Sequence, residues 1–273
     1  MWKCLLLVLV ITIPGCTQPI LKEENMILAT TTSMRDSGLL DTLLPAFTES
    51  TGIEIDYIAV GSGAALNLGK SGDADLLIVH TPNAELKFIE DGYGIERKIF
   101  AWNLFVILSP VNDPVGITGN LSESLVKIAE SEHCFISRGD NSGTHMKEQE
   151  LWNSITGINN IEITTDSLGI HPIGEWYYSI GQGMSAAITM AYEKDCYTLS
   201  DKGTYLFRDD VDLIAHEFNN QLTLNPYSVI LLDTKYSLES QLFFDYLFGE
   251  GALLIENYSI NNKQLFYSGQ PDH

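Results

Sequence analysis

Positive charge is scarce in this 273-residue chain, which has 15 Lys and Arg against 36 Asp and Glu and a formal net charge of −21. This balance argues against a nucleic-acid partner, because binding to a phosphate backbone needs clustered Lys and Arg. It favours solubility and few non-specific contacts. An anion could be bound by this chain only through local donors, since the overall charge opposes it.

Long apolar runs are also lacking, because no segment reaches the ~20 residues of a membrane-spanning helix. The apolar run 4–14 has the length of a signal-peptide core, and Lys3 precedes it. Small or bent residues stand just before Cys16. We therefore expect removal of residues 1–15, a lipid on Cys16, and a tether over 16–25. Ordinary cleavage without lipidation is the alternative. Both place the mature protein outside the membrane, and lipidation anchors it to the outer face.

Cysteine is used sparingly, with four residues in all. After removal of the signal peptide and use of Cys16 as an anchor, only Cys134 and Cys196 remain. They could pair in an oxidising compartment, or each could be a free buried thiol at the end of an apolar run. No Cys/His spacing suggests zinc, so no metal site and no cofactor are expected.

Short apolar runs alternate with amphipathic segments along the mature chain, which predicts an α/β fold with a parallel sheet and helices on both faces. The helix over 39–51 is expected to be capped by Ser37 or Asp36 and to stop at Gly52. The other expected strands and helices are strands 26–30, 53–60, 75–79, 100–109, 134–136, 196–199 and 228–232, and helices 64–70, 83–91, 122–132, 144–155, 185–193, 238–248 and 252–258.

One large domain or two lobes of ordinary size suit the roughly 250 residues that follow the signal peptide. The segment 111–119 is rich in Pro, Gly and Asn, which makes it the expected boundary. A second crossing is expected over 216–227. Lobe I would then contain residues 26–109 and 226–273, and lobe II residues 110–225, with a ligand cleft between them.

Three polar turns stand where a predicted strand gives way to a helix: Thr30–Ser33, Gly61–Gly63 and Ser137–His145. Helix N-termini offer unpaired N–H groups, and ligands of open α/β sheets bind beyond the carboxyl ends of the strands. Helix capping alone is the alternative explanation for each turn. The third turn exceeds what capping needs, because it carries Arg138, Ser142 and Thr144 together. A guanidinium can hold an oxyanion through two parallel hydrogen bonds, or it can pair with Asp140, and both can occur.

The third turn, Arg138 to His145, resembles the oxyanion loop of periplasmic phosphate- and tungstate-binding proteins. Four other stretches, at 30–33, 72–80, 181–184 and 197–201, are similar to the tungstate-binding component of the tungstate ABC importer. The resemblance implies a type II periplasmic-binding fold, with two α/β lobes joined by two crossing segments. It also implies a tungstate or molybdate ligand, an ABC permease and its ATPase as partners, a monomer, and no enzymatic activity.

The same resemblance implies the ligand donors, which come from all three turns. Gly183 and Met184 either line the cleft or serve close helix packing. The implied oxyanion-binding residues are Thr32, Ser33, Ser62, Arg138, Ser142, Gly143 (through its backbone N–H) and Thr144.

Two other functions stay open at this point. A secreted serine hydrolase could use Ser142 and His145, although residues three apart on a helix approach each other regardless of chemistry, and no third group is evident. A phosphate-binding protein of the same fold could use Asp73 or Asp75 to accept a phosphate proton. We expect both carboxylates to lie away from the cleft, with Asp75 in a structural role.

Overall fold

The computed structural model describes residues 25–271. The predicted signal peptide (1–15), the lipid anchor Cys16 and nearly all of the tether (16–25) lie outside the described residues. Within the described range, no helix combines the length and the apolar character that crossing a membrane requires.

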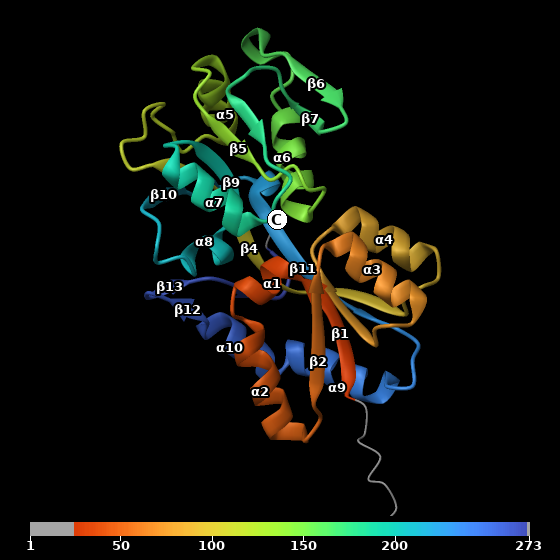
Figure 1. Cartoon of the computed structure of the whole chain (residues 1–273). Coiled ribbons are helices and arrows are strands. Elements are labelled where there is room, and N and C mark those ends of the chain that lie inside the picture. The colour runs from red at the N-terminus through yellow and green to blue at the C-terminus, as the bar shows by residue number, and fades with distance from the viewer. Residues whose placement is uncertain (1–24, 272–273) are drawn as a thin grey trace, which may run out of the picture.

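Two α/β lobes share one path of hydrogen-bonded strands, in the order β2-β1-β3-β11-β4-β9-β5-β8 (Figure 1). Lobe I contains β1 (Met26–Thr31), α1 (Thr32–Asp36), α2 (Leu40–Thr51), β2 (Ile55–Val60), α3 (Ser62–Ser71), β3 (Leu76–Val79), α4 (Pro82–Glu90), α9 (Ser237–Phe248), α10 (Glu250–Asn257), β12 (Ser259–Ile260), β13 (Lys263–Gln264) and β14 (Tyr267–Ser268). Lobe II contains α5 (Leu121–Glu130), β5 (Phe135–Ser137), α6 (Gly143–Asn153), the 3-10 helix η1 (Ile158–Asn160), β6 (Ile163–Asp166), β7 (Gly169–Pro172), β8 (Tyr177–Ser179), α7 (Met184–Glu193), β9 (Tyr197–Asp201), α8 (Lys202–Leu206) and β10 (Leu213–His216).

Two strands cross between the lobes, β4 (Glu96–Pro110) and β11 (Leu224–Leu231), and the 3-10 helix η2 (Gln221–Thr223) leads into the second. β11 pairs antiparallel with β4 up to the pair Leu224↔Leu104. From Phe105 onward β4 pairs with β9 instead. A single strand thus belongs to the sheets of both lobes, and Figure 1 shows β4 and β11 running between them.

Helices cover both faces of each sheet, as the alternation in the sequence predicts. In lobe I, one core packs α2 and α9 on the sheet and a second core packs α3 and α4 on its other face. In lobe II, α5 and α6 cover one face and α7 the other. The expected α/β fold class is confirmed, but the sheet is mixed rather than parallel, because the crossing strands β4 and β11 run antiparallel to their neighbours. Each predicted helix corresponds to an observed one with ends shifted by a few residues.

The expected cap of α2 is wrong. α2 begins after Leu39 without a side-chain cap, whereas Ser37 ends an additional short helix, α1, that the sequence reading missed. The Ser37 hydroxyl donates to the carbonyl of Met34 at 2.8 Å and accepts from the backbone N–H of Leu39 at 3.5 Å, so it bridges α1 and the residue before α2. Gly38, with φ of 72°, then reverses the chain between the two helices.

Cys134 and Cys196 form a disulfide that joins the starts of β5 and β9, with a Cα–Cα distance of 4.7 Å. The sequence left this pairing open. The bond closes a 62-residue separation inside lobe II, and it fixes two neighbouring parallel strands whose carboxyl ends reach the candidate site.

Candidate functional site

The polar turns of lobe I meet at one edge of its sheet. β1 pairs in parallel with β2, with Thr31 opposite Val60, and with β3, with Thr30 opposite Ile78. The residues that follow these strands therefore lie at the same level, beyond the carboxyl ends. They include Ser33 on α1, Ser62 at the start of α3, and His80 after β3.

Lobe II presents the same kind of edge. β5 pairs in parallel with β8 and β9, so the segments that follow Ser137, Ser179 and Asp201 come together. Arg138 follows β5 directly, and the loop after it leads into the N-terminus of α6. Helix N-termini point unpaired N–H groups outward, so this loop adds backbone donors to the guanidinium.

Arg138 is buried, with 5% of its surface exposed, and its guanidinium is held in place within its own loop. Nη2 lies 2.6 Å from Asp140 Oδ2, and Nη1 lies 3.5 Å from Thr144 Oγ1. Burial raises the pKa of Asp140, but a hydrogen bond from Ser142 and the charge of Arg138 outweigh it, so the pKa lies below its ordinary value. An ionised Asp140 thus orients Arg138, as the sequence suggested.

Among the predicted oxyanion-binding residues, two buried donors have no hydrogen-bond partner in the described part of the chain. They are the hydroxyl of Ser62 in lobe I and Nε of Arg138 in lobe II. A buried polar group without a partner is destabilising by about 1–3 kcal/mol, so native structures rarely keep one without a reason. An oxyanion in the cleft would supply acceptors for both.

Ser142 and His145 do not form a nucleophile–base pair. The Ser142 hydroxyl caps α6 by accepting from the backbone N–H of His145 at 3.4 Å. The His145 ring accepts from the backbone N–H of Asn141 through Nδ1 at 3.1 Å. Both groups therefore serve the turn itself, which weakens the hydrolase alternative.

Asp75 occupies the opposite end of the sheet from the site. Its Oδ2 accepts from the backbone N–H of Ile27 at 2.9 Å, near the amino ends of β1 and β3. The Asp73 carboxylate accepts from Ser71 at 2.5 Å, just after α3. Asp75 has the structural role expected for it, and neither carboxylate is placed to accept a phosphate proton in the cleft.

His80 is a component of this region to which the sequence reading gave no role. Its Nε2 lies 3.1 Å from Ser33 Oγ, its Nδ1 lies 2.8 Å from Asn225 Oδ1, and its ring stacks on Tyr227 with centroids 4.8 Å apart. Burial lowers the pKa of His80 to about 4, helped by the charge of Arg138 and opposed by the Asn225 hydrogen bond. The ring is thus neutral at pH 7. The sequence signal for such a role was the position of His80 directly after β3, at the sheet edge where the turns Thr30–Ser33 and Gly61–Gly63 lie.

The lobes touch at His80. A Cβ placed on Gly143, at the start of α6, would lie 3.1 Å from His80 Cε1 and 3.3 Å from Nε2. Only a residue without a side chain lets α6 approach the ring this closely. A hollow of about 140 Å³ beside this contact is lined by His80 and the start of α4 from lobe I and by Gly143 and Met146 from lobe II.

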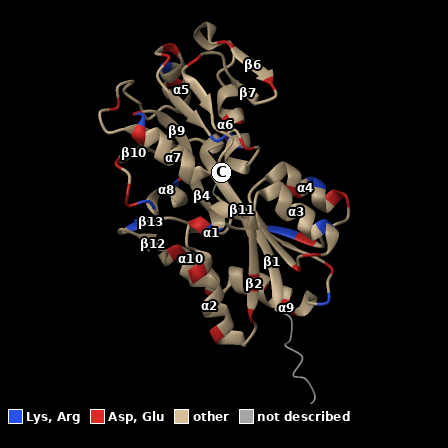
Figure 2. Ribbon diagram, in the orientation of Figure 1, with Lys and Arg blue, Asp and Glu red and all other residues tan. Residues whose placement is uncertain are grey.

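The buried acids near the site are driven toward their neutral forms. Glu148 on α6 accepts from Tyr177 Oη at 2.6 Å and from Trp152 Nε1 at 3.3 Å, and burial raises its pKa to about 7. Burial also raises the pKa of Asp201, which caps α8. Most other acids lie on outer helices and loops of both lobes (Figure 2). The high acidic content is therefore compatible with a local anion site.

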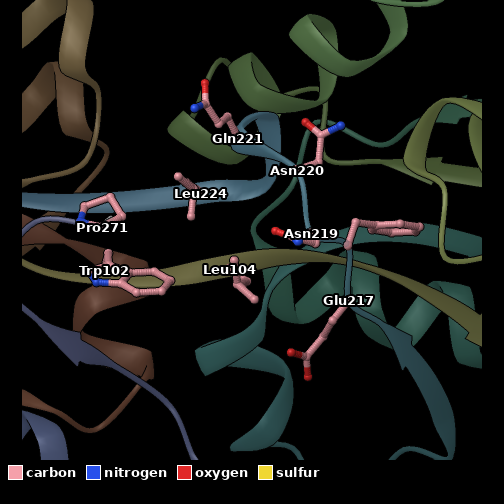
Figure 3. A pocket seen from close by; sticks show the side chains of 9 residues that line it. Trp102, Leu104, Glu217, Asn219, Asn220, Gln221, Leu224 and Pro271 are labelled. Carbon is pink, nitrogen blue, oxygen red and sulfur yellow. The ribbon is translucent and has the colours of Figure 1, made fainter. Parts of the chain in front are cut away.

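A larger cavity of about 540 Å³ lies against the crossing strands, away from the predicted residues. Figure 3 shows Trp102 and Leu104 from β4 and Leu224 from β11 in its wall. None of the seven predicted oxyanion-binding residues lines it. Its polar side chains come from the segment that precedes β11.

Comparison with known proteins gives a consistent result. The PBP superfamily domain model matches residues 18–238. The chain is 45% identical to the tungstate-binding protein TupA of Peptoclostridium acidaminophilum, over 76% of this chain and 70% of that protein. Its structure is similar to the tungstate-binding protein TupA from Desulfovibrio alaskensis G20 (35% identity, TM-score 0.75, covering 90% and 99% of the two chains). It is also similar to the tungstate ABC transporter structure from Geobacter sulfurreducens (41% identity, TM-score 0.74, covering 86% and 99%).

The Gly143–His80 contact can be tested with Gly143→Ala. The added methyl group would press on the His80 ring. We therefore expect weaker anion binding, measured as a larger dissociation constant, with little change in the free energy of unfolding. Gly119→Ala is the control, because a Cβ there meets nothing within 4 Å and Gly119 lies outside the three predicted turns. Calorimetric titration and urea denaturation of both variants give the comparison. Equal affinities for the two variants would show that the lobes do not close against this ring.

The raised pKa of Glu148 predicts a pH-dependent effect of Glu148→Gln. The folded pKa of about 7 exceeds the unfolded value of 4.5, so the stabilisation from the bound proton is present below 4.5 and is lost as the pH rises through 7. The free energy of unfolding of the variant should therefore rise relative to that of the wild type with increasing pH, by up to about 1.4 kcal/mol per pH unit. Urea denaturation across this window measures it, with the exposed Glu150→Gln as control. Parallel curves for Glu148→Gln and wild type would contradict the assignment.

Proposed function

Since the chain belongs to the PBP superfamily and, within it, to the family of TupA tungstate-binding proteins, we propose that it is the extracytoplasmic solute-binding component of an ABC importer. Its ligand is tungstate, with molybdate as a second ligand of nearly the same size and charge. It captures the oxyanion and delivers it to the permease, which the partner ATPase drives.

The observation that carries this proposal is that two of the predicted binding residues, Ser62 in lobe I and Arg138 in lobe II, have a buried donor (Oγ and Nε) without a hydrogen-bond partner within residues 25–271. They come from opposite lobes and from two of the three turns named by the sequence. A tetrahedral dianion between the lobes would accept from both. A ligand that accepts hydrogen bonds from both lobes at once would also hold the lobes together.

The proposed binding set uses the residues predicted from the sequence. Arg138 supplies the positive charge, and the N-termini of α3 and α6 supply backbone N–H groups with a partial positive charge. Small hydroxyl side chains let the backbone approach the ligand. The full set is Thr32, Ser33, Ser62, Arg138, Ser142, Gly143 and Thr144.

Capture depends on movement of the lobes, which we take as residues 26–109 with 226–273 and residues 110–225. Open lobes admit the hydrated anion, and closure replaces its water with fixed N–H and O–H dipoles. Such dipoles act strongly at short range in a dry site. The closed form presents a surface that joins both lobes, and this surface is what the permease would recognise.

The proposed role is binding without turnover. The Ser142 hydroxyl and the His145 ring both serve the α6 turn, which favours a binding protein over a hydrolase. A phosphate-binding protein of the same fold is the nearest alternative. The positions of Asp73 and Asp75 disfavour it, because neither carboxylate reaches the cleft.

The protein is proposed to act as a monomer held at the outer face of the cell membrane. The sequence supports cleavage after residue 15 and a lipid on Cys16, with residues 16–25 as the tether. Mass spectrometry of the membrane-extracted protein would show a diacylglyceryl group on Cys16. An unmodified mature N-terminus would contradict the anchor and leave a free secreted protein.

Arg138→Ala tests the proposed site. Loss of a charged hydrogen-bond donor should weaken tungstate binding by about 1.5–3 kcal/mol, or roughly one to two orders of magnitude in the dissociation constant. Calorimetric titration measures this change. Lys127→Ala is the charge control, because Lys127 pairs with Glu123 on the exposed surface of α5. An unchanged dissociation constant for Arg138→Ala would remove this residue from the site.

A further inference from the structure

A series of buried hydrogen bonds runs from the turn Thr30–Ser33 to both crossing strands, β4 and β11. Thr31 Oγ1 lies 3.1 Å from Ser33 Oγ, which lies 3.1 Å from His80 Nε2. His80 Nδ1 lies 2.8 Å from Asn225 Oδ1 on β11, and Asn225 Nδ2 lies 2.8 Å from Asn103 Oδ1 on β4. All five side chains are buried, so their polar atoms depend on one another for partners.

The orientation of the Asn225 amide in this structure gives the series of hydrogen bonds a direction of proton donation. Its amide nitrogen faces two oxygens, Asn103 Oδ1 at 2.8 Å and Tyr227 Oη at 3.1 Å, so its own oxygen faces His80. An amide oxygen can only accept, so this orientation of Asn225 goes with a proton on Nδ1 of His80. In the neutral ring Nε2 is then an acceptor, and it accepts a hydrogen bond from the Ser33 hydroxyl.

Ser33 has a single hydroxyl proton, so it cannot donate to His80 and to an anion at the same time. Thr31 Oγ1 accepts from the backbone N–H of Met34 at 3.2 Å and is placed to donate onward to Ser33. The hydroxyl protons of Thr31 and Ser33 are thus directed along this series of hydrogen bonds, whereas Thr30 donates to the carbonyl of Ile78 at 3.0 Å. The backbone N–H of Ser33 lies in the first turn of α1, where a helix offers no internal acceptor.

We propose that His80 is a positioning residue of the oxyanion site. His80 accepts a hydrogen bond from the Ser33 hydroxyl, so that Ser33 binds the anion through its backbone N–H. His80 also connects this turn to β4 and β11 through Asn225 and Asn103. The inference rests on the proposed function, because it places an anion beside Ser33. The same ring meets Gly143 of lobe II, so one side chain links the anion turn, the crossing strands and the opposing lobe.

Two substitutions of His80 separate its two nitrogens. In His80→Gln the amide oxygen replaces Nε2 and keeps the acceptor for Ser33, whereas His80→Asn keeps only the side that faces Asn225. We expect His80→Gln to bind tungstate within about threefold of wild type and His80→Asn to bind about tenfold more weakly. Ser33→Ala should show the same tenfold loss, and the double variant Ser33→Ala/His80→Asn should lose no more than either single variant.

Additive losses in this cycle would overturn the proposal, because they would mean that the Ser33 hydroxyl contacts the anion independently of His80. Equal losses for His80→Gln and His80→Asn would also overturn it, because the ring would then only fill space. Calorimetric titration supplies the dissociation constants, and urea denaturation checks that each variant is folded.

A second measurement needs no ligand. Nitrogen-15 NMR of the histidine side chains in the free wild-type protein distinguishes the two neutral tautomers, and His80→Gln assigns the His80 signals. We expect a proton on Nδ1 and a bare Nε2. A proton on Nε2 would reverse the series of hydrogen bonds and overturn the proposal. Wild-type protein that binds no oxyanion would overturn the proposed function and its link to His80, while a bare Nε2 would still establish the direction of the series of hydrogen bonds.

Discussion

The pairing of β4 with β11 is the constraint on which the rest of the structure depends. Because β4 pairs with β11 up to Leu104 and with β9 from Phe105, one strand carries the chain from the first sheet into the second. The parallel strands of each lobe then end beside this crossing. Within each lobe, parallel pairing brings turns that are distant in the sequence to one edge of the sheet. We propose that the turns before α3 and α6 face the same cleft.

Electrostatics at the cleft differ from those of the chain as a whole. The net charge of −21 would repel a dianion if it acted at the site. Burial instead favours the neutral forms of Glu148 and Asp201, and Asp140 uses its charge to hold Arg138. In the proposed site the positive group is therefore Arg138, which pairs with the ionised Asp140 and is accompanied by neutral donors. Screening by salt reduces the effect of the outer acids over about 8–10 Å.

Local patterns predicted most of the fold, because buried parallel strands and amphipathic helices leave clear periodicities. The pattern failed where polar segments form structure, as in α1 and in the β6–β7 hairpin. The seven proposed ligand residues stay predictions, although the structure puts Ser62 and Arg138 in the environment that they require. His80 was missed because its partner Asn225 is 145 residues away. A pairing formed only by the return of β11 leaves no local signal.

The most direct measurement is a calorimetric titration of the mature domain with tungstate, molybdate, sulfate and phosphate in turn. We expect one-to-one binding of tungstate, binding of molybdate at the same site, and no heat from sulfate or phosphate. Tight binding of phosphate with no response to tungstate would keep the fold and overturn the substrate. No response to any of the four anions would contradict the oxyanion site itself.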